Sequence, residues 1–301
     1  MQTLRLGTRG SPLALAQARL VADALIKAHD RLEIEIVTLK TGGDRIQDRP
    51  LAEIGGKALW TKELDRALLA GETHLSVHSM KDVESFRPEG LGIAAMLPRA
   101  DVRDKLIGAA SIDALGEGAV VGTSSPRRAA QLLALRPDLD IRTFRGNVAT
   151  RLARLDKGEA DATLLAAAGL DRLGMSEIGT PIEIDVMLPA AAQGAVGIDA
   201  RDGDEEVRRL LAAIDHRPTH RCVLAERAFV AALGGDCHSP VAAHATLDGE
   251  RLVLRAQILS EDGAATVEGE AEMPLDDVAP AAALARELLD EAPESIGKLF
   301  A

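Results

Sequence analysis

Residues 120–128, Val-Val-Gly-Thr-Ser-Ser-Pro-Arg-Arg, pass from a short apolar run through a turn of small residues into the start of a helix. The same order occurs at residues 4–12, which read Leu-Arg-Leu-Gly-Thr-Arg-Gly-Ser-Pro. In both stretches Ser-Pro follows the turn, and serine as N-cap with proline at the first helical position is a common helix start. The repeat predicts two similar α/β lobes and suggests an internal duplication.

Arginines accompany these turns. Arg9 lies within the first turn, Arg127 and Arg128 follow the second, and a third turn at residues 144–151 carries two more arginines beside the predicted N-cap Asn147. Backbone N–H groups at a helix N-terminus and guanidinium groups both bind carboxylates and phosphates. Three such turns predict a ligand with several negative charges, held in a cleft between the two lobes.

The rest of the chain extends this pattern. Helices are predicted at 12–28, 59–70 and 147–158, and strands at 33–37, 75–77 and 162–165. The glycine-rich segment 40–57 is too long for an ordinary connection, which indicates a mobile lid. After Pro218 a helix at 219–233, three strands at 241–247, 252–259 and 266–273, and a helix at 279–290 predict a small α+β domain with Cys237 on a loop.

Composition restricts the class of protein. The 301 residues carry a net charge of −12, which argues against a general nucleic-acid or anionic-membrane surface, so any anion site must be local. Two cysteines provide neither a disulfide framework nor zinc-ligand spacing. His216 and His220 are four residues apart, but no third ligand is placed by the sequence, so no metal site is predicted. Without a signal peptide or a membrane-length apolar run, we expect a soluble cytoplasmic protein.

Nine ordered sequence blocks resemble the porphobilinogen deaminase (hydroxymethylbilane synthase) family over almost the whole chain. They are LGTRGSPLALAQ (6–17), GGKALWTKELDRALL (55–69), VHSMKDV (77–83), VGTSSPRR (121–128), FRGNVATRL (144–152), AAAGLDRLG (166–174), LPAAAQGAVGI (188–198), ERAFVAAL (226–233) and GGDC (234–237). The chain departs from the family at Asp236, where glycine is common, and at Trp60, where phenylalanine is usual.

The resemblance implies a transferase of three domains. Two α/β lobes, residues 1–96 with 195–214 and residues 97–194, are expected to resemble type II periplasmic binding proteins, and residues 216–301 form the α+β domain. Such enzymes join four porphobilinogen molecules head to tail with loss of ammonia. They make 1-hydroxymethylbilane for haem and other tetrapyrroles. We expect a monomer that needs no nucleic-acid or membrane partner.

The resemblance also implies roles for individual residues. Cys237 would hold a dipyrromethane cofactor through a thioether, and Asp82 would be the catalytic aspartate. The predicted cofactor-binding residues are Ser79, Lys81, Thr123, Ser125, Arg127, Arg128 and Arg151. The predicted substrate-binding residues are Arg9, Ser11, Arg145, Lys57, Trp60 and Gln193.

Two other classes of protein are compatible with the anion-binding turns. A two-lobed receptor without catalysis would use the same lobes, but the expected third domain and the loop cysteine argue against it. A phosphate-ester or nucleotide enzyme would use the same turns, but the sequence has neither a Walker pattern nor an acidic metal-binding cluster.

Overall fold

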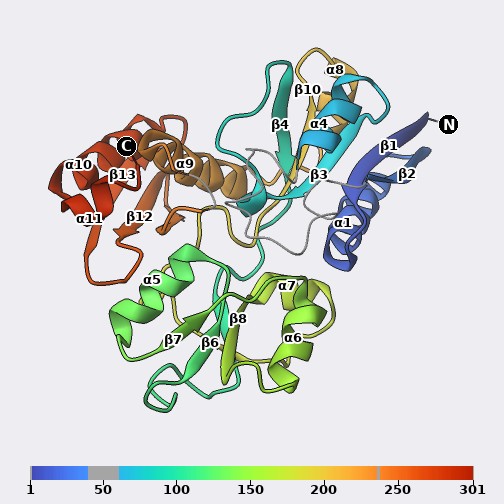
Figure 1. Ribbon diagram of the computed structural model, residues 1–301. Coiled ribbons are helices and arrows are strands. Elements are labelled where there is room, and N and C mark those ends of the chain that lie inside the picture. The colour runs from blue at the N-terminus through green and yellow to red at the C-terminus, as the bar shows by residue number, and fades with distance from the viewer. Residues whose placement is uncertain (1, 40–60, 236–237, 301) are drawn as a thin grey trace. The chain divides into compact units, whose positions relative to one another are not determined.

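The computed structural model describes residues 2–39, 61–235 and 238–300 (Figure 1). The chain divides into two units, Met1–Ala100 with Gly194–His220, and Asp101–Gln193 with Arg221–Ala301. The predicted lid at 40–57, Lys57, Trp60 and Cys237 lie outside the described residues. Among the residues that are described, no helix combines the length and the apolar character needed to cross a membrane.

The first unit is built on a five-stranded sheet with the order β2-β1-β3-β10-β4. Strands β1, β2 and β3 are parallel, and β10 runs antiparallel to both β3 and β4. Its elements are β1 (Gln2–Arg9), α1 (Pro12–Ala28), β2 (Leu32–Leu39), α4 (Lys62–Leu69), β3 (Leu75–Ser79), the 3₁₀ turn η1 (Met80–Asp82), β4 (Leu91–Met96), β10 (Val196–Arg201) and α8 (Glu205–Ala212).

The two faces of this sheet differ in chemistry. Helices α1 and α8 pack on an apolar face, which includes Val77 of β3 and Ile198 of β10. Successive residues of a strand point to opposite faces. His78 and Asp199 therefore lie on the other face, where Asp65 of α4 is close enough to share a charged cluster with them. The polar face of the sheet is thus buried beneath α4.

The second unit contains a sheet with the same design, in the order β7-β6-β8-β5-β9. Strands β6, β7 and β8 are parallel, and β5 is antiparallel to β8 and β9, which reproduces the strand directions of the first sheet. The elements are β5 (Asp104–Ile107), β6 (Val120–Gly122), α5 (Pro126–Leu135), β7 (Asp140–Arg142), α6 (Val148–Asp156), β8 (Ala162–Ala166), α7 (Ala167–Arg172) and β9 (Thr180–Pro181). The prediction of two similar α/β lobes is confirmed.

The C-terminal elements come next, and the second unit includes the chain from Arg221 onward. They are α9 (Arg217–Leu233), the antiparallel sheet β11 (Val241–Asp248), β12 (Arg251–Leu259) and β13 (Thr266–Pro274), α10 (Ala279–Glu291) and α11 (Glu294–Gly297). Residues of α9, the sheet and α10 share one apolar core, in which Cys222 is buried. This confirms the predicted α+β fold. The boundaries of three separate domains stay a prediction, because the structure groups two sheets in one unit.

The helix starts agree with the sequence analysis. Ser11 accepts a hydrogen bond from the Ala14 N–H, Ser125 from the Arg128 N–H, and Asn147 from the Thr150 N–H. Each side chain satisfies one N–H group that the first helical turn leaves without an intrahelical acceptor. Proline occupies the first position of α1 and of α5. All three predicted N-caps are therefore confirmed.

Candidate functional site

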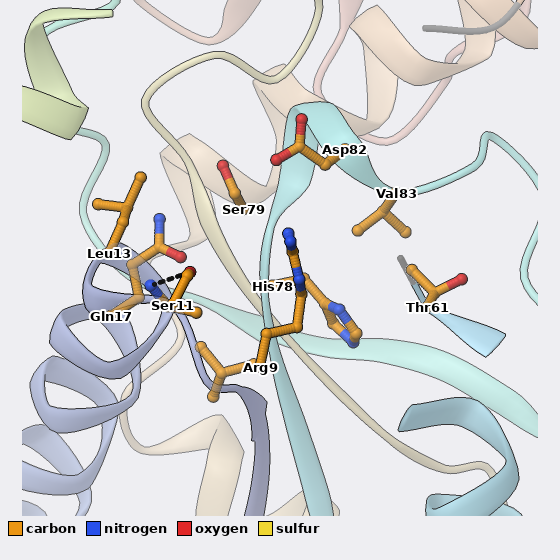
Figure 2. Close-up of a pocket in the computed structure, with 11 residues that line it drawn as sticks. Arg9, Ser11, Leu13, Gln17, Thr61, His78, Ser79, Asp82 and Val83 are labelled. Atoms are coloured by element: carbon orange, nitrogen blue, oxygen red, sulfur yellow. Dashed lines mark hydrogen bonds between the residues drawn. The ribbon is translucent and has the colours of Figure 1, made fainter. Parts of the chain in front are cut away.

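A pocket in the first unit collects four predicted site residues, Arg9, Ser11, Ser79 and Asp82 (Figure 2). Strands β1 and β3 are parallel neighbours, so their carboxyl ends reach the same edge of the sheet. Arg9 ends β1 and Ser79 ends β3, while Ser11 and Asp82 follow in the next turn of chain. The remaining pocket residues are Leu13, Ala14, Gln17, Thr61, Val77, His78 and Val83.

The pocket combines a cation, a helix terminus and a carboxylate. Figure 2 shows the guanidinium end of Arg9 pointing toward Ser79 and Asp82. The first turn of α1 contributes to the lining, which places the positive end of the helix dipole at the pocket. Arg9 and α1 can therefore bind an anionic group, while Asp82 places a negative charge in the same space.

The turn that carries Asp82 is fixed from beneath by Met80. The Met80 side chain is 1% exposed and its N–H donates to the carbonyl oxygen of Ala195, at 3.1 Å. A Cβ at Gly197 would lie 2.0 Å from the Met80 sulfur, so only glycine at that position allows this packing. Asp82 is half-buried at the end of this anchored turn. Lys81, on the same turn, is half-buried and is not among the pocket residues.

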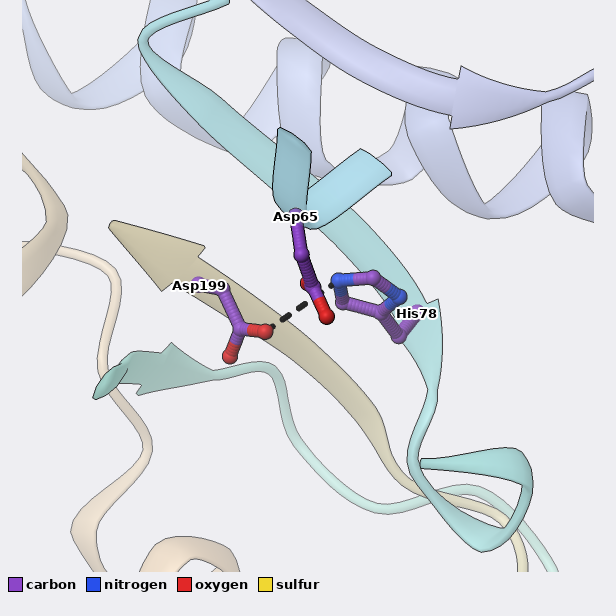
Figure 3. A group of neighbouring side chains, drawn as sticks. All are labelled: Asp65, His78 and Asp199. Atoms are coloured by element: carbon purple, nitrogen blue, oxygen red, sulfur yellow. Dashed lines mark ion pairs between the residues drawn. The ribbon is translucent and has the colours of Figure 1, made fainter. Parts of the chain in front are cut away.

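Behind the pocket, the polar face of the sheet holds a buried ion network (Figure 3). His78 lies 3.2 Å from Asp199, and Arg87 pairs with Asp199 at 2.6 Å and also with Asp65. Burial raises the pKa of Asp65 above its ordinary value, although the Arg87 guanidinium opposes the shift.

The two aspartates and His78 are close enough to hold a metal ion. Arg87, however, already provides a positive charge between the two carboxylates, so we assign the cluster to ion pairing. Arg87 follows Asp82 by five residues, and its ion pairs with Asp65 of α4 and Asp199 of β10 anchor the segment that follows η1.

In the second unit, the predicted arginine pair surrounds a single carboxylate. Arg127 and Arg128 each donate from Nη2 to one oxygen of Asp104, at 2.6 Å in both cases. Gln193 donates its side-chain amide to the same carboxylate at 2.9 Å. The side chains of all three charged residues are at most 6% exposed. Two guanidinium groups and one carboxylate leave a net charge of +1, which favours a nearby anion.

The electrostatics of this cluster follow from burial and pairing. Burial opposes ionisation of Asp104, but the guanidinium groups of Arg127 and Arg128 outweigh it and hold the pKa of Asp104 far below its ordinary value. Burial lowers the pKa of Arg127, and Asp104 opposes that shift. Asp104 is therefore ionised whenever the protein is folded at neutral pH.

The turn before α5 collects the other predicted groups of this unit. Ser125 caps α5, and its backbone N–H donates to the Thr123 hydroxyl at 3.2 Å. Arg151 reaches this turn from α6, because its Nη2 donates to the Ser124 hydroxyl at 3.1 Å. Arg145 is half-buried in the loop between β7 and α6. The structure thus places Thr123, Ser125 and Arg151 around one helix N-terminus.

Several residues of these sites were not predicted. Asp104, Asp199 and Arg87 carry no local signal, since each is one charged residue in a strand or loop whose partners are distant in sequence. His78 lies within a block that was recognised, but no role was predicted for it.

His216 and His220 have separate hydrogen-bond partners, Thr219 at 2.8 Å and Asp215 at 2.9 Å.

The structure is that of an α/β protein with two sheets of the same design, each of which has arginine side chains beside a helix N-terminus. Family models add the identity. The model described as porphobilinogen deaminase, dipyromethane cofactor binding domain, matches residues 4–209, and the C-terminal domain model of the same family matches residues 220–293. The chain belongs to the porphobilinogen deaminase family, as the sequence blocks predicted.

Curated relatives agree. The porphobilinogen deaminase of Sphingopyxis alaskensis is 58% identical over 306 residues, which cover 99% of this chain and 96% of that protein. The porphobilinogen deaminase of Paracoccus denitrificans is 51% identical, with coverage of 96% and 95%. The predicted cofactor class is also confirmed by the family model, whose description names the dipyrromethane cofactor.

Solved structures show a weaker likeness to binding proteins. The probable amino-acid ABC transporter extracellular-binding protein YtmK of Bacillus subtilis has a TM-score of 0.43 at 13% identity, covering 76% of this chain and 97% of that one. A BvgS VFT2 domain of Bordetella pertussis has a TM-score of 0.40 at 17% identity, with coverage of 75% and 90%. These scores are too low to support a statement about ligands.

Proposed function

We propose that the chain is a transferase that condenses four porphobilinogen molecules head to tail, with release of ammonia, to give 1-hydroxymethylbilane in tetrapyrrole biosynthesis. One observation supports it most directly: the pocket of the first unit places Asp82 beside Arg9 and the N-terminus of α1. Family membership provides the reaction, and this pocket provides the opposite charges that the reaction requires.

Asp82 has the chemistry for the bond-breaking step. When the C–N bond of porphobilinogen breaks, ammonia leaves and a positive charge spreads over the pyrrole ring and its N–H. A carboxylate beside that N–H stabilises the developing charge and can assist proton movement. The new C–C bond then forms between the CH₂ carbon and the free α-carbon of a second pyrrole, which loses its proton. We assign Asp82 to this role.

The arginines have the chemistry for binding. Each porphobilinogen carries an acetate and a propionate, and guanidinium groups bind carboxylates in two-point geometry. Arg9 and Ser11 lie at one helix N-terminus. We assign these two, with Arg145, Gln193, Lys57 and Trp60, to substrate binding.

The turn before α5 fits the carboxylates of a dipyrromethane. A capped helix N-terminus, the Arg151 guanidinium and the net positive cluster around Asp104 provide donors and charge of the sign it needs. We propose that Cys237 attaches the group through a thioether. We assign its binding to Thr123, Ser125, Arg127, Arg128 and Arg151, with Ser79 and Lys81. When bound, it would supply the pyrrole α-carbon to which the first substrate is joined.

The finer proposals concern organisation. We propose three domains, residues 1–96 with 195–214, 97–194 and 216–301, and a cytoplasmic monomer that uses no nucleic acid. The separate core formed by α9, β11–β13 and α10 supports the third domain. Light scattering would test the monomer, and limited proteolysis would test the boundaries.

The mass of the intact protein tests the function. Wild-type protein should exceed its sequence mass by two linked pyrrole units, and Cys237→Ser should lose both the added mass and the activity. Cys222→Ala, a change in the core of the C-terminal elements, should keep both. An unmodified wild-type protein with full activity would contradict the tether, and a protein that binds polycarboxylates without releasing ammonia would favour a receptor.

A further inference from the structure

The loop at residues 188–193 contacts the arginine cluster of the second unit at both of its ends. At the start, the Leu188 carbonyl oxygen accepts from Arg127 Nη1 at 2.9 Å and from Gln131 Nε2 at 3.0 Å. At the end, the amide of Gln193 donates to Asp104 at 2.9 Å and to the Val102 carbonyl oxygen at 2.7 Å. The conformation of this loop therefore helps to determine where Asp104 and the arginines lie.

The middle of the loop is held by the C-terminal elements. The N–H of Ala243 on β11 donates to the Pro189 carbonyl oxygen at 3.1 Å. The N–H of Ala192 donates to one carboxylate oxygen of Glu226, at 2.5 Å. The other oxygen of Glu226 accepts from the Ala245 N–H at 2.8 Å. Glu226 is 0% exposed and lies on α9, so a buried carboxylate joins the loop to β11.

Ala192 has an unusual backbone. Its φ of +60° is left-handed, and it is one of two non-glycine residues with positive φ among those the structure describes. The Cβ of alanine makes this conformation about 5- to 30-fold less populated than the right-handed one unless other contacts hold it. The hydrogen bond from the Ala192 N–H to Glu226 is such a contact.

We propose that Glu226 is a positioning residue, which holds the left-handed turn at Ala192 and thereby sets Gln193, Asp104 and the Arg127–Arg128 pair in place for an anionic ligand. Helix α9 ends at Leu233, and Cys237 follows four residues later. The helix that precedes the cysteine in the sequence is thus the one that contacts the loop 188–193, which in turn contacts the arginine cluster. The proposal rests on the proposed cofactor-binding role of the arginine pair.

Glu226→Gln separates positioning from other roles. Glutamine has one acceptor oxygen, so it can serve either the Ala192 N–H or the Ala245 N–H, but not both. Cofactor-free protein is incubated with porphobilinogen, and the gain of the two-pyrrole mass is followed over time. Glu226→Gln should load about 5- to 30-fold more slowly than wild type, and Glu287→Gln, an exposed carboxylate on α10, should load normally.

A second substitution tests the cause. Glycine adopts left-handed φ without penalty, so Ala192→Gly added to Glu226→Gln should bring loading to within about threefold of wild type. If Glu226 only stabilised the fold, Ala192→Gly would not restore the loading rate of Glu226→Gln. If Glu226→Gln does not fold, Ala192→Val keeps the carboxylate and disfavours the turn, so it should also load slowly.

The outcomes separate the two hypotheses. Normal loading in Glu226→Gln, slow loading that glycine does not rescue, or normal loading in Ala192→Val would each overturn the positioning role. Arg128→Leu is measured in parallel. Normal loading in that variant would instead refute the proposed role of the arginine pair.

Discussion

Replacing Asp104 with asparagine would remove the only negative charge between Arg127 and Arg128 in the cluster described above. The asparagine keeps the shape of the side chain, but its amide nitrogen cannot accept the hydrogen bond that one guanidinium donates at 2.6 Å. Two buried cations would then lie side by side without a counter-charge. Gln193 donates to the same carboxylate, so its side-chain amide would lose a charged acceptor as well.

The size of the effect follows from burial. Two charge-assisted hydrogen bonds contribute about 1.5–3 kcal/mol each, and breaking a buried ion pair by removing one partner costs about 3–5 kcal/mol. These are two descriptions of the same loss, so they are not added. We expect the free energy of unfolding to fall by about 3–5 kcal/mol for Asp104→Asn, a large part of a typical total of about 5–15 kcal/mol.

The pH dependence of stability gives an independent test of the role of Asp104. Because the pKa of Asp104 is lowered in the folded protein, its contribution is present above the ordinary aspartate pKa and is lost as pH falls through the folded value. The difference in stability between wild type and Asp104→Asn should therefore be constant from about pH 7 to pH 5 and shrink below about pH 4. Urea unfolding followed by circular dichroism at several pH values measures both quantities.

A matched control comes from an exposed pair. Asp140 and Arg142 are 2.9 Å apart, and their side chains are 50% and 56% exposed. Asp140→Asn should change stability by less than about 1 kcal/mol. A loss of stability in Asp104→Asn no larger than in this control, or a loss that does not shrink at acid pH, would show that Asp104 is not the buried counter-charge of the arginine pair.

Three further predictions concern the first unit. Asp82→Asn should fold and bind polycarboxylates but release ammonia at least about 100-fold more slowly in a single turnover, whereas Asp82→Glu should keep partial activity; equal rates would show that charge is irrelevant there. Arg9→Leu should slow substrate addition by about one to two orders of magnitude while cofactor mass is retained, and normal turnover would contradict its carboxylate contact. Arg87→Met should destabilise the protein by about 3–5 kcal/mol in urea, with partial recovery when Asp65→Asn is added, since the unpaired carboxylate causes the loss.

Features that depend on neighbouring residues could be predicted from the sequence. The N-caps Ser11, Ser125 and Asn147 were all predicted, because a cap hydrogen bond spans only three residues. The two C-terminal hairpins were also located, since Asp248-Gly249 and Asp262-Gly263 place glycines with φ of +59° and +70° where the chain reverses.

Features that depend on distant partners could not be predicted. Strand β10 is inserted between β3 and β4 but begins at residue 196, long after β4 ends at residue 96, and no local pattern specifies that position. The same limit applies to Glu226, whose carboxylate accepts hydrogen bonds from the N–H groups of Ala192 and Ala245, 34 and 19 residues away in the sequence. The family resemblance located the sequence blocks in which β10 begins and Glu226 lies. The structure was needed to identify the distant residues that they contact.

The two aspartates associated with the arginines illustrate why burial decides function. Both lie near guanidinium groups, so charge pattern alone does not distinguish them. Asp104 is fully buried and uses both oxygens to bind Arg127 and Arg128, which leaves no route for a substrate proton. Asp82 is half-buried and lines a pocket, so a pyrrole N–H can approach it. An aspartate that stabilises a transient cation on the substrate must be both ionised and accessible to the substrate. Of these two aspartates, only Asp82 is accessible.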